Sequence, residues 1–479
     1  MSLSRISLVL LATSATISHF APFASAQGIR KSKARNSKLQ IGTEEVNVPA
    51  QKKPFSFFDR LLGKGDSKDD RHLSTSIHYS QMGIDIDGQF IDDGLGKSIA
   101  MSKDGLRVAI AAPGGSSGRG ATRVLDWDAT PEEWIQVGQD IVGPSVNFGL
   151  GWSMDMNEDG SRIVLGAPEA NNDDGAMYVY ELDENNTWQI LGSAINPESA
   201  KGQAGVSVTM SATGDRIAFG APRTNAYSGR VTAFHLVDGQ WVRLGQNMDC
   251  MEYYAYSGGS IAMDADGTRI VVGGRLGSYY TGYVKVFDYN DTTSQWEMNG
   301  YLSGQGYYDR FGSDVDISED GNRVVIGAYT SDGQSAGIHD TGEFCVMEYD
   351  GSTWNILGTQ VVGTVQMDQV GDSVIMSGDG THVAISAPGS DNNGQNAGKV
   401  KVYKYSETDQ AWLPQGIDID GECEGDKLGE GGSAVAMDRN GSHLAVGAQR
   451  GNYYAGMSRV YEALAGAGDG TGGSTNNCE

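Results

Sequence analysis

The chain has few cysteines, prolines and basic residues for its length: among 479 residues, 4 are Cys, 11 are Pro and 35 are Lys or Arg. Cys250, Cys345, Cys423 and Cys478 lack the close spacing of a zinc site, and we expect at most one disulfide, which would involve Cys478. After residue 26 no apolar run approaches the roughly 20 residues of a membrane span. The sequence therefore predicts no zinc module, no disulfide-dense scaffold and no membrane span.

Glycine and aromatic residues are plentiful, with 68 Gly, 21 Tyr, 12 Phe and 8 Trp. No strict Gly-X-Y period is present, which excludes collagen, and so much Gly disfavours long helical arrays. A hydrophobic content of 39% supplies a sizeable core and excludes simple disorder. The composition predicts a β-rich chain with many tight turns.

Charge is distributed unevenly along the chain. The net charge of −26 comprises +1 for residues 1–26, +5 for residues 27–75 and −32 for the remainder. An acidic body repels phosphate groups, so we expect neither nucleic acid nor anionic membrane as a partner.

Both ends of the chain differ from the body. Residues 1–26 have an apolar run and end in Ala24-Ser25-Ala26, which predicts a secretory signal peptide. We interpret residues 27–75 as a basic linker or propeptide, 76–463 as the folded body and 464–479 as a Gly-rich tail. The protein is thus expected to be secreted or displayed on a cell surface. As an alternative, Phe20-Ala21-Pro22 and the basic stretch after it resemble bipartite leaders that lead through the secretory route to complex plastids.

One unit of about 56 residues recurs seven times. Its first landmark is an aromatic residue followed four positions later by Gly. The pairs are Tyr79 and Gly83, Trp134 and Gly138, Trp188 and Gly192, Trp241 and Gly245, Trp296 and Gly300, Trp354 and Gly358, and Trp412 and Gly416. We expect these Trp side chains to be structural.

Two further landmarks follow in each unit. The first is a serine at Ser98, Ser153, Ser207, Ser260, Ser313, Ser373 and Ser433. The second is a turn dipeptide at Asp104-Gly105, Asp159-Gly160, Thr213-Gly214, Asp266-Gly267, Asp320-Gly321, Asp379-Gly380 and Asn440-Gly441. Such dipeptides supply the positive φ angles of tight hairpins.

Each unit contains four short strands, which predicts a blade of a β-propeller. The fold class is therefore all-β: a seven-bladed propeller of four-stranded antiparallel blades, expected to be monomeric. The last unit ends near Tyr461 without its fourth strand. Because residues 79–88 match residues 412–421 almost residue for residue, the first strand is predicted to complete the seventh blade.

At Phe148-Gly149, Gly166-Ala167-Pro168, Phe311-Gly312 and Gly327-Ala328, the unit resembles the FG-GAP repeat of the integrin alpha-subunit propeller. The resemblance covers about 80% of the chain. It implies a binding and adhesion platform of secreted or surface proteins, and some family members bind calcium in their turns.

Two turns resemble those calcium loops, one with Asp155, Asn157 and Asp159 and one with Asp316, Ser318 and Asp320. Oxygen ligands at alternate positions around a Gly turn suit Ca²⁺. Ile163 and Val324 stand at the last carboxylate position of the motif, after Arg162 and Arg323. Calcium is therefore one interpretation; the other is that each Asp caps its own turn and each Arg forms an ion pair.

Tyrosines gather in the loops that an antiparallel blade places on one face. They are Tyr227, Tyr253, Tyr254, Tyr256, Tyr279, Tyr280, Tyr307, Tyr308, Tyr453 and Tyr454. Flat rings with a polar tip suit stacking on sugars or anchoring of a protein partner. We expect a binding propeller that recognises a protein or glycan ligand, with divalent cations as a candidate aid. The alternative is a carbohydrate-active hydrolase or lyase whose carboxylates gather at the propeller axis from several blades.

Two glycosylation sequons begin at Asn185 and Asn290. Both lie in hairpins expected on the face opposite the tyrosines, where a glycan would leave the tyrosine face free.

Overall fold

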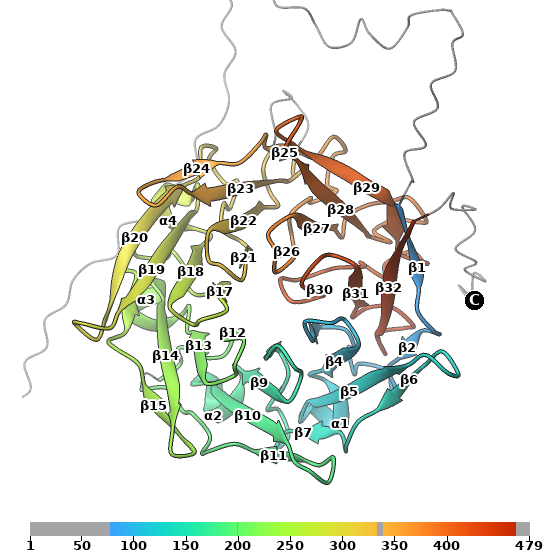
Figure 1. Ribbon diagram of the computed structural model, residues 1–479, viewed down its shortest axis with the longest axis horizontal. Helices are drawn as coiled ribbons and strands as arrows, with labels where there is room; N and C mark the ends of the chain where they lie inside the picture. The colour runs from blue at the N-terminus through green and yellow to red at the C-terminus, as the bar shows by residue number, and fades with distance from the viewer. Residues whose placement is uncertain (1–76, 199, 333–338, 466–479) are drawn as a thin grey trace, which may run out of the picture. The chain divides into compact units, whose positions relative to one another are not determined.

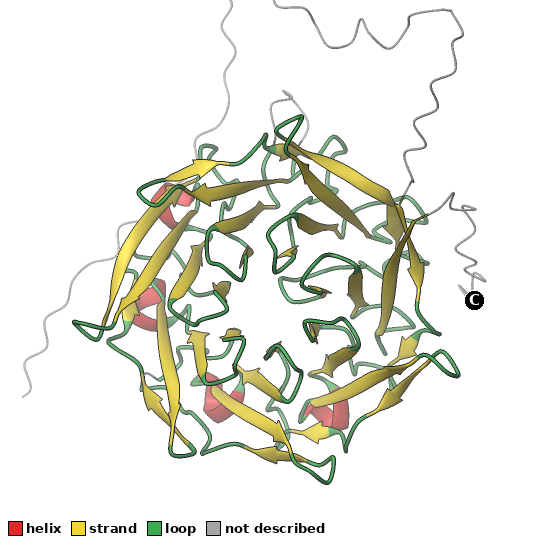
Figure 2. Cartoon of the chain, in the orientation of Figure 1, coloured by secondary structure: helices red, strands yellow, loops and turns green. Residues whose placement is uncertain are grey.

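Seven antiparallel sheets form a ring in the computed structural model, which describes residues 77–465 except 199 and 333–338 (Figures 1 and 2). The predicted signal peptide and linker, and almost all of the predicted tail, lie outside the described residues. The all-β, seven-bladed prediction is confirmed.

The blades are numbered here from the first complete sheet, with strands given from the axis outward. Blade 1 comprises β3 (Ser98–Met101), β4 (Arg107–Ala112), β5 (Ala121–Asp128), β6 (Glu133–Gln136) and β7 (Ile141–Val142). Blade 2 comprises β8 (Ser153–Met156), β9 (Arg162–Ala167), β10 (Ala176–Leu182) and β11 (Trp188–Ile190). Blade 3 comprises β12 (Ser207–Met210), β13 (Arg216–Gly220), β14 (Arg230–Val237), β15 (Gln240–Arg243) and β16 (Met248–Asp249).

The remaining blades have the same plan. Blade 4 comprises β17 (Ile261–Met263), β18 (Arg269–Gly274), β19 (Tyr283–Asn290) and β20 (Gln295–Ser303). Blade 5 comprises β21 (Val315–Ile317), β22 (Arg323–Ala328), β23 (Glu343–Tyr349), β24 (Trp354–Ile356) and β25 (Val361–Val362). Blade 6 comprises β26 (Val374–Met376), β27 (His382–Ala387), β28 (Lys399–Ser406) and β29 (Ala411–Asp420).

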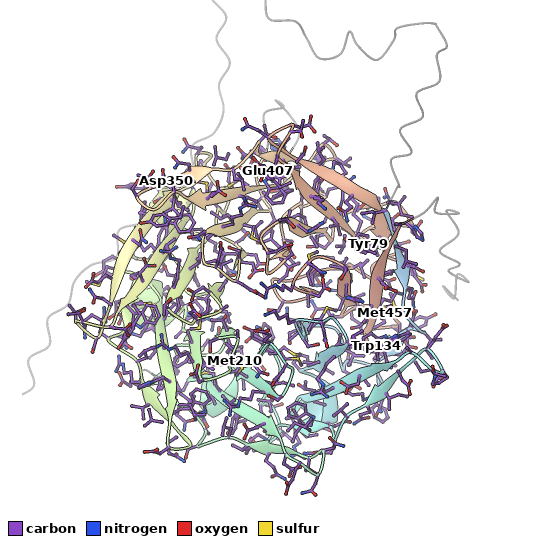
Figure 3. All side chains as sticks on the ribbon, viewed as in Figure 1. Tyr79, Trp134, Met210, Asp350, Glu407 and Met457 are labelled. Atoms are coloured by element: carbon purple, nitrogen blue, oxygen red, sulfur yellow. The ribbon has the colours of Figure 1, made fainter. Side chains whose placement is uncertain are left out.

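Blade 7 is built from both ends of the described chain. It comprises β30 (Val435–Met437), β31 (His443–Ala448) and β32 (Met457–Ala465), completed by β1 (Ile77–Gln81) and β2 (Ile86–Asp87). Strand β1 pairs antiparallel with β32, with Tyr79 opposite Ala463, and Figure 3 shows Tyr79 and Met457 on this blade. The predicted closure of the ring by the first strand is confirmed.

The core lies in seven layers, one between each pair of neighbouring blades. The repeated aromatic–glycine pair explains part of this packing. The indole N–H of Trp188 donates to the Val137 carbonyl oxygen at 3.0 Å in the preceding blade. A Cβ on Gly138 would lie 2.8 Å from Cδ1 of that same Trp188, so the small residue makes room for the ring of the next blade. The structural role expected for these Trp residues follows from this geometry.

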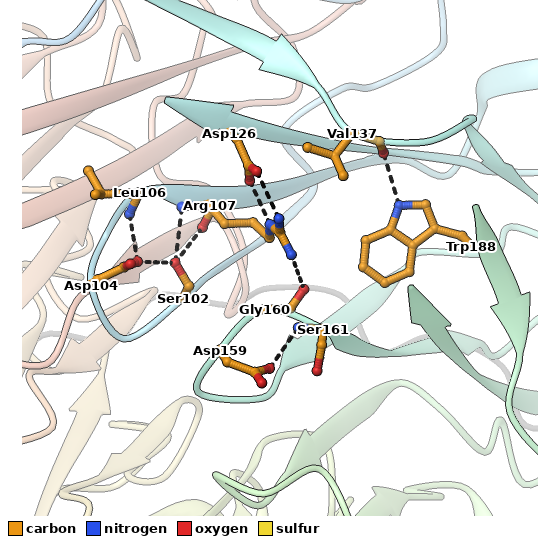
Figure 4. Close-up of polar contacts among 10 residues, drawn as sticks. All are labelled: Ser102, Asp104, Leu106, Arg107, Asp126, Val137, Asp159, Gly160, Ser161 and Trp188. Atoms are coloured by element: carbon orange, nitrogen blue, oxygen red, sulfur yellow. Dashed lines mark hydrogen bonds and ion pairs between the residues drawn. The ribbon is translucent and has the colours of Figure 1, made fainter. Parts of the chain in front are cut away.

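An arginine that recurs after the turn between the first and second strands also joins neighbouring blades. Figure 4 shows Arg107 donating to both carboxylate oxygens of Asp126, at 2.6 and 2.8 Å, and to the Gly160 carbonyl oxygen of the next blade at 3.1 Å. Arg162 forms the same kind of contacts with Glu181 and the Gly214 carbonyl oxygen. In blades 1, 2, 4 and 5 the arginine after the turn is therefore an ion-pair partner and a link to the next blade. Arg216 of blade 3 makes the link to the Gly267 carbonyl oxygen and lies opposite His235.

Strand register corrects two repeat alignments. Ser98, Ser153 and Ser207 each donate to a glycine carbonyl oxygen of the next blade. In blades 5 and 7, however, the positions equivalent to Ser98 are Asp314 and Ala434, each one residue later than the predicted Ser313 and Ser433.

The two Phe-Gly pairs of the FG-GAP resemblance also occupy different positions of the repeat. Gly120 faces the backbone of Leu150, as Gly282 faces that of Phe311. Leu150-Gly151, and not Phe148-Gly149, is therefore the equivalent of Phe311-Gly312.

Candidate functional site

Each blade presents two kinds of loop at one end of the propeller. The crossover that enters a blade pairs with the loop between the second and third strands of the blade before it, through parallel bridges such as Gly229 with Ser257 and Gly282 with Phe311. We call this end the crossover face. The Asp-Gly turns and the outer hairpins lie at the opposite end, which we call the turn face.

Eight of the ten predicted tyrosines lie together on the crossover face over blades 3 to 5. We call them the tyrosine belt: Tyr227, Tyr253, Tyr254, Tyr256, Tyr279, Tyr280, Tyr307 and Tyr308. The ring of Tyr227 stacks on Tyr254 with centroids 5.7 Å apart and contacts Tyr256 at 5.2 Å. One blade further, Tyr280 contacts Tyr307 at 5.9 Å and Tyr308 at 5.3 Å. Six of the eight belt rings thus form two clusters on neighbouring blades.

The belt is exposed and its backbone is strained. Tyr279 has 91% and Tyr253 has 78% of its surface exposed. Six belt residues have left-handed backbone angles, with φ between 55° and 72°: Tyr227, Tyr254, Tyr256, Tyr279, Tyr280 and Tyr308. This conformation costs a residue with a side chain roughly 1–2 kcal/mol.

The short segments after the second strands carry much of this strain. They include α1 (Gly115–Gly118), α2 (Ala170–Asp173), α3 (Thr224–Tyr227) and α4 (Gly277–Tyr280), all with left-handed inner residues. Asn171 and Asn172 in α2 tolerate such angles well, whereas Tyr279 in α4 does not.

Tyr453 and Tyr454 form a separate site on blade 7. They have the same left-handed angles, with φ of 56° and 67°, and are 64% and 57% exposed. Blade 7 lies across the ring from blade 4 in Figure 1. The structure therefore separates this pair from the tyrosine belt.

In the two candidate calcium loops, the side chains form hydrogen bonds within the protein. Asp155 accepts the N–H of Met210 in the next blade at 2.7 Å, and Asp316 accepts that of Met376 at 2.7 Å. Asn157 instead donates to Asp159 at 2.9 Å within the turn.

In the second loop, Ser318 donates to Asp320 at 2.6 Å. Within the residues described, no group of three or more His, Cys, Asp or Glu side chains could hold a metal ion. Calcium at these turns stays a prediction.

Buried carboxyl groups from blades 2 and 5 lie near the axis. The fully buried Asp314 accepts the Ser260 hydroxyl and the Val374 N–H, both at 2.8 Å. Burial raises the pKa of Asp314 to about 8, that of Asp316 to about 7 and that of Asp155 to about 6. Near neutral pH, Asp314 is therefore a proton-bearing carboxyl group.

Charged side chains lie at both ends of the axis. On the turn face, Glu319 forms an ion pair with Arg439 at 2.8 Å and lies 4.0 Å from the amine of Lys103. These two contacts join blades 5, 7 and 1. On the crossover face, Asp372 accepts the Gly431 N–H at 2.7 Å, and Lys97 lies 4.9 Å from the ring centroid of Trp152. Burial raises the pKa of Asp372 and lowers that of Lys97. The crossover face thus offers an acid and a weakened base near the axis.

Sequence reasoning missed Asp314, Asp372 and Lys97. Asp314 stands where five blades have Ser, so an alignment of the repeats anchored on the last residue of each inner strand would have exposed it. Lys97 and Asp372 precede their inner strands, and their proximity depends on ring geometry that no local pattern encodes.

The two sequon asparagines differ in exposure. Asn185 is exposed in the hairpin between β10 and β11. Asn290 is half-buried, and its amide donates to Glu297 at 2.9 Å while its oxygen accepts the Thr292 N–H. Glycosylation of either remains a prediction.

The three described cysteines are in two chemical states. Cys250 and Cys345 are buried free thiols, Cys423 is disulfide-bonded, and Cys478 lies outside the described residues. Over residues 77–465, apart from the gaps at 199 and 333–338, no helix is long and apolar enough to cross a membrane.

Comparisons with known proteins define the class of fold. No protein-family model matches the sequence, and no curated protein matches it. Hydrazine synthase of Kuenenia stuttgartiensis is a similar solved structure, with a TM-score of 0.51 and 12% identity over 80% of this chain and 99% of that chain. A putative 6-phosphogluconolactonase of Bacteroides fragilis has a TM-score of 0.47 and 11% identity, covering 67% and 83% of the two chains. The likeness to the first shows that this chain has a known propeller architecture.

Proposed function

We propose that this protein is a secreted or cell-surface binding propeller that recognises a protein or carbohydrate ligand through the tyrosine belt. One observation carries the proposal: six of the eight belt tyrosines occupy left-handed backbone positions. Asn or Gly would relieve that strain, as Asn does at positions 171 and 172. Backbone strain concentrates at functional sites, and here it displays aromatic rings to solvent.

The chemistry of the belt suits a ligand with flat apolar faces and hydroxyl groups. Exposed phenol rings can stack on sugar rings or anchor a protein loop, and their hydroxyl groups can hydrogen-bond to either. Arg275 lies 5.5 Å from the centroid of Tyr256, adding a cation beside the rings. The FG-GAP resemblance supports the same role, since it implies a binding and adhesion platform.

The test is a glycan-array and cell-surface binding screen, run with and without a chelator. The variants are Tyr279→Asn and Tyr308→Asn, and the matched controls are Tyr453→Asn and Tyr454→Asn, which have the same backbone angles on blade 7. We expect all four to raise the free energy of unfolding by a few tenths to about 1 kcal/mol. The belt variants lose at least about tenfold in affinity and the controls retain it.

Unchanged binding by both belt variants would overturn the proposal. The two arms of the screen separate a glycan from a protein ligand. Loss of binding in chelator supports calcium as an aid, and its restoration by Ca²⁺ would identify that cation.

A second function is supported by the carboxyl groups near the axis. Asp372 has a raised pKa and Lys97 a lowered one, and both residues are only half-buried, so that they combine the properties of a general acid and base with access to a substrate. They favour the alternative of a hydrolase or lyase acting on carbohydrate. Turnover on a polysaccharide panel that disappears in Asp372→Asn would establish it.

Secretion or display on the cell surface is part of the first proposal. Fluorescent tagging of residues 1–75 distinguishes secretion or surface display from import into a complex plastid, because the tag reports its compartment directly.

A further inference from the structure

One residue precedes the inner strand of each blade, at the crossover end of the axis that these strands surround (Figure 1). All seven of these residues are half-buried, whereas the residue after each of them is buried. Strand register identifies them as Lys97, Trp152, Val206, Gly259, Ser313, Asp372 and Ser433. Residues from blades far apart in the sequence are therefore accessible to solvent at one end of the axis.

Lys97 is a cation of this group whose ammonium lacks a polar partner. Among the described residues it forms no ion pair and no hydrogen bond, and it lies 4.9 Å from the centroid of the Trp152 ring. Lys103 follows the same inner strand at the turn face, where it pairs with Glu158 and lies 4.0 Å from Glu319. An adjacent carboxylate favours the charged form of a lysine. The lysines at the two ends of β3 therefore differ, since an ion pair holds only Lys103.

A glycine joins the Lys97 amine to a carboxyl group of blade 6. Residues 430–433 of blade 7 fill the position that the single residue Lys97 fills in blade 1, and Gly431 belongs to this insertion. The Gly431 N–H donates to Asp372 at 2.7 Å, and a Cβ on Gly431 would lie 2.8 Å from Nζ of Lys97. The missing side chain thus lets the amine approach the residue that is hydrogen-bonded to the Asp372 carboxyl group.

The charged groups that act on Lys97 are Glu430, Asp372 and Arg450. Burial lowers the pKa of Lys97, against the two carboxyl groups, which raise it. Burial also raises the pKa of Asp372. Glu430 accepts from Lys427 at 2.9 Å and from Nε of Arg450 at 2.7 Å, so other cations compensate its charge. The protein thus shifts the amine towards its neutral, nucleophilic form and Asp372 towards its proton-bearing form.

We propose that Lys97 forms an imine with a neutral aldehyde or ketone at the crossover end of the axis, and that Asp372 supplies the proton. The Nζ lone pair attacks the carbonyl carbon, and a proton moves from nitrogen to the carbonyl oxygen to give a carbinolamine. Asp372 donates its proton to that hydroxyl group, which leaves as water while the nitrogen lone pair forms the C=N bond. The products are a protonated imine on Lys97, a carboxylate on Asp372 and one water molecule.

The surroundings of the amine favour a neutral carbonyl compound. The carboxyl groups of Asp372 and Glu430 lie near it, and the acidic body repels an anion such as an α-keto acid. The Trp152 ring beside the amine suits the C–H face of a short sugar chain. An open-chain hydroxyaldehyde has this chemistry. The inference goes beyond the second proposed function, since imine formation requires no cleavage of a polysaccharide, and it does not involve the tyrosine belt.

The test is incubation of the full chain with glycolaldehyde at about pH 7.5 in the presence of sodium cyanoborohydride, which reduces an imine to a stable secondary amine. Peptide mapping by mass spectrometry then locates the modified lysines. We expect Lys97 to be modified at least about tenfold faster than Lys103, because a lysine of ordinary pKa is almost entirely protonated at this pH. Glyoxylate is the anionic aldehyde of the same length, and it should show a smaller ratio of modification at Lys97 to that at Lys103.

Two variants connect the reaction to the axial groups. Asp372→Asn keeps an acceptor for the Gly431 N–H but removes the proton donor, and it should slow modification of Lys97 at least about tenfold. If Asp372 acted only through its charge, this variant would speed the reaction, because loss of a neighbouring carboxylate lowers the pKa of an amine. Lys103→Arg is the matched control at the other end of β3 and should leave modification of Lys97 unchanged. Melting temperatures verify that both variants are folded.

The proposal is overturned if Lys97 reacts no faster than Lys103, or if Asp372→Asn reacts as fast as the wild type or faster. An equal or larger ratio with glyoxylate would overturn the restriction to neutral compounds. Turnover of a polysaccharide without modification of Lys97 would retain the second proposed function and refute the imine, whereas modification without turnover would do the reverse.

Discussion

At the scale of single residues, Asp314 is the most unusual substitution in the repeat. Ser153 or Ser207 at the equivalent position donates to a carbonyl oxygen, whereas Asp314 accepts the Ser260 hydroxyl and the Val374 N–H in a fully buried site. It links three blades with a carboxyl group that forms no ion pair among the described residues. Folding therefore favours the protonated form, which is why its pKa rises to about 8.

This raised pKa predicts a stability that falls with pH. Below the unfolded-state pKa of about 3.9 both states hold the proton, and Asp314 imposes no penalty. Between about 4 and 8 the unfolded chain releases the proton while the folded chain keeps it, so the stability of the fold decreases, and above about 8 the penalty is constant. Asp314→Asn should remove this dependence and exceed wild type by more than about 1 kcal/mol at pH 8.5.

Denaturant unfolding at several pH values measures the effect. At pH 4 the variant and wild type should differ little, which controls for lost hydrogen bonds. A gap that is the same at pH 4 and pH 8.5 would show that folding does not raise the pKa of Asp314.

At the scale of structural elements, the repeat made the blades predictable. Trp188 and Gly138 constrain one another across two blades, so each landmark recurs wherever the packing recurs. The same logic predicted that Tyr79 would complete blade 7. The proximity of Lys97 and Asp372 could not be predicted in this way, because they precede the inner strands of blades 1 and 6 and approach one another only in the closed ring.

Strand β1 should contribute as much stability as any interior strand. Tyr79 is 7% exposed, packs in the layer between blades 6 and 7, and donates its hydroxyl to the Gly441 carbonyl oxygen at 3.0 Å. Tyr79→Ala is therefore expected to lower the free energy of unfolding by about 3–5 kcal/mol. Trp412→Ala at the equivalent place in blade 6 should cost a similar amount.

Thermal and denaturant unfolding of the two variants provide the comparison, with Ser80→Ala as a neighbouring control on the same strand. A loss below about 1 kcal/mol for Tyr79→Ala would mean that β1 does not hold the ring closed.

At the scale of the whole molecule, two electrostatic effects oppose one another. Residues beyond 75 carry a net charge of −32, which repels itself across the propeller. Local ion pairs such as Arg269 with Asp288, at 2.6 Å, hold neighbouring strands together and are half-buried. Salt weakens both effects, but the Debye length is about 10 Å at 0.1 M, far beyond the separation of the paired groups.

Salt should therefore reduce the long-range repulsion more than it reduces the ion pairs. The melting temperature is expected to rise by a few degrees between about 0.05 and 0.5 M NaCl. Differential scanning calorimetry of the propeller at both concentrations measures this, with the uncharged solute sucrose as a control for general solvent effects. A melting temperature that falls with NaCl would mean that the short ion pairs between strands, and not the repulsion of the acidic body, dominate the electrostatics of the ring.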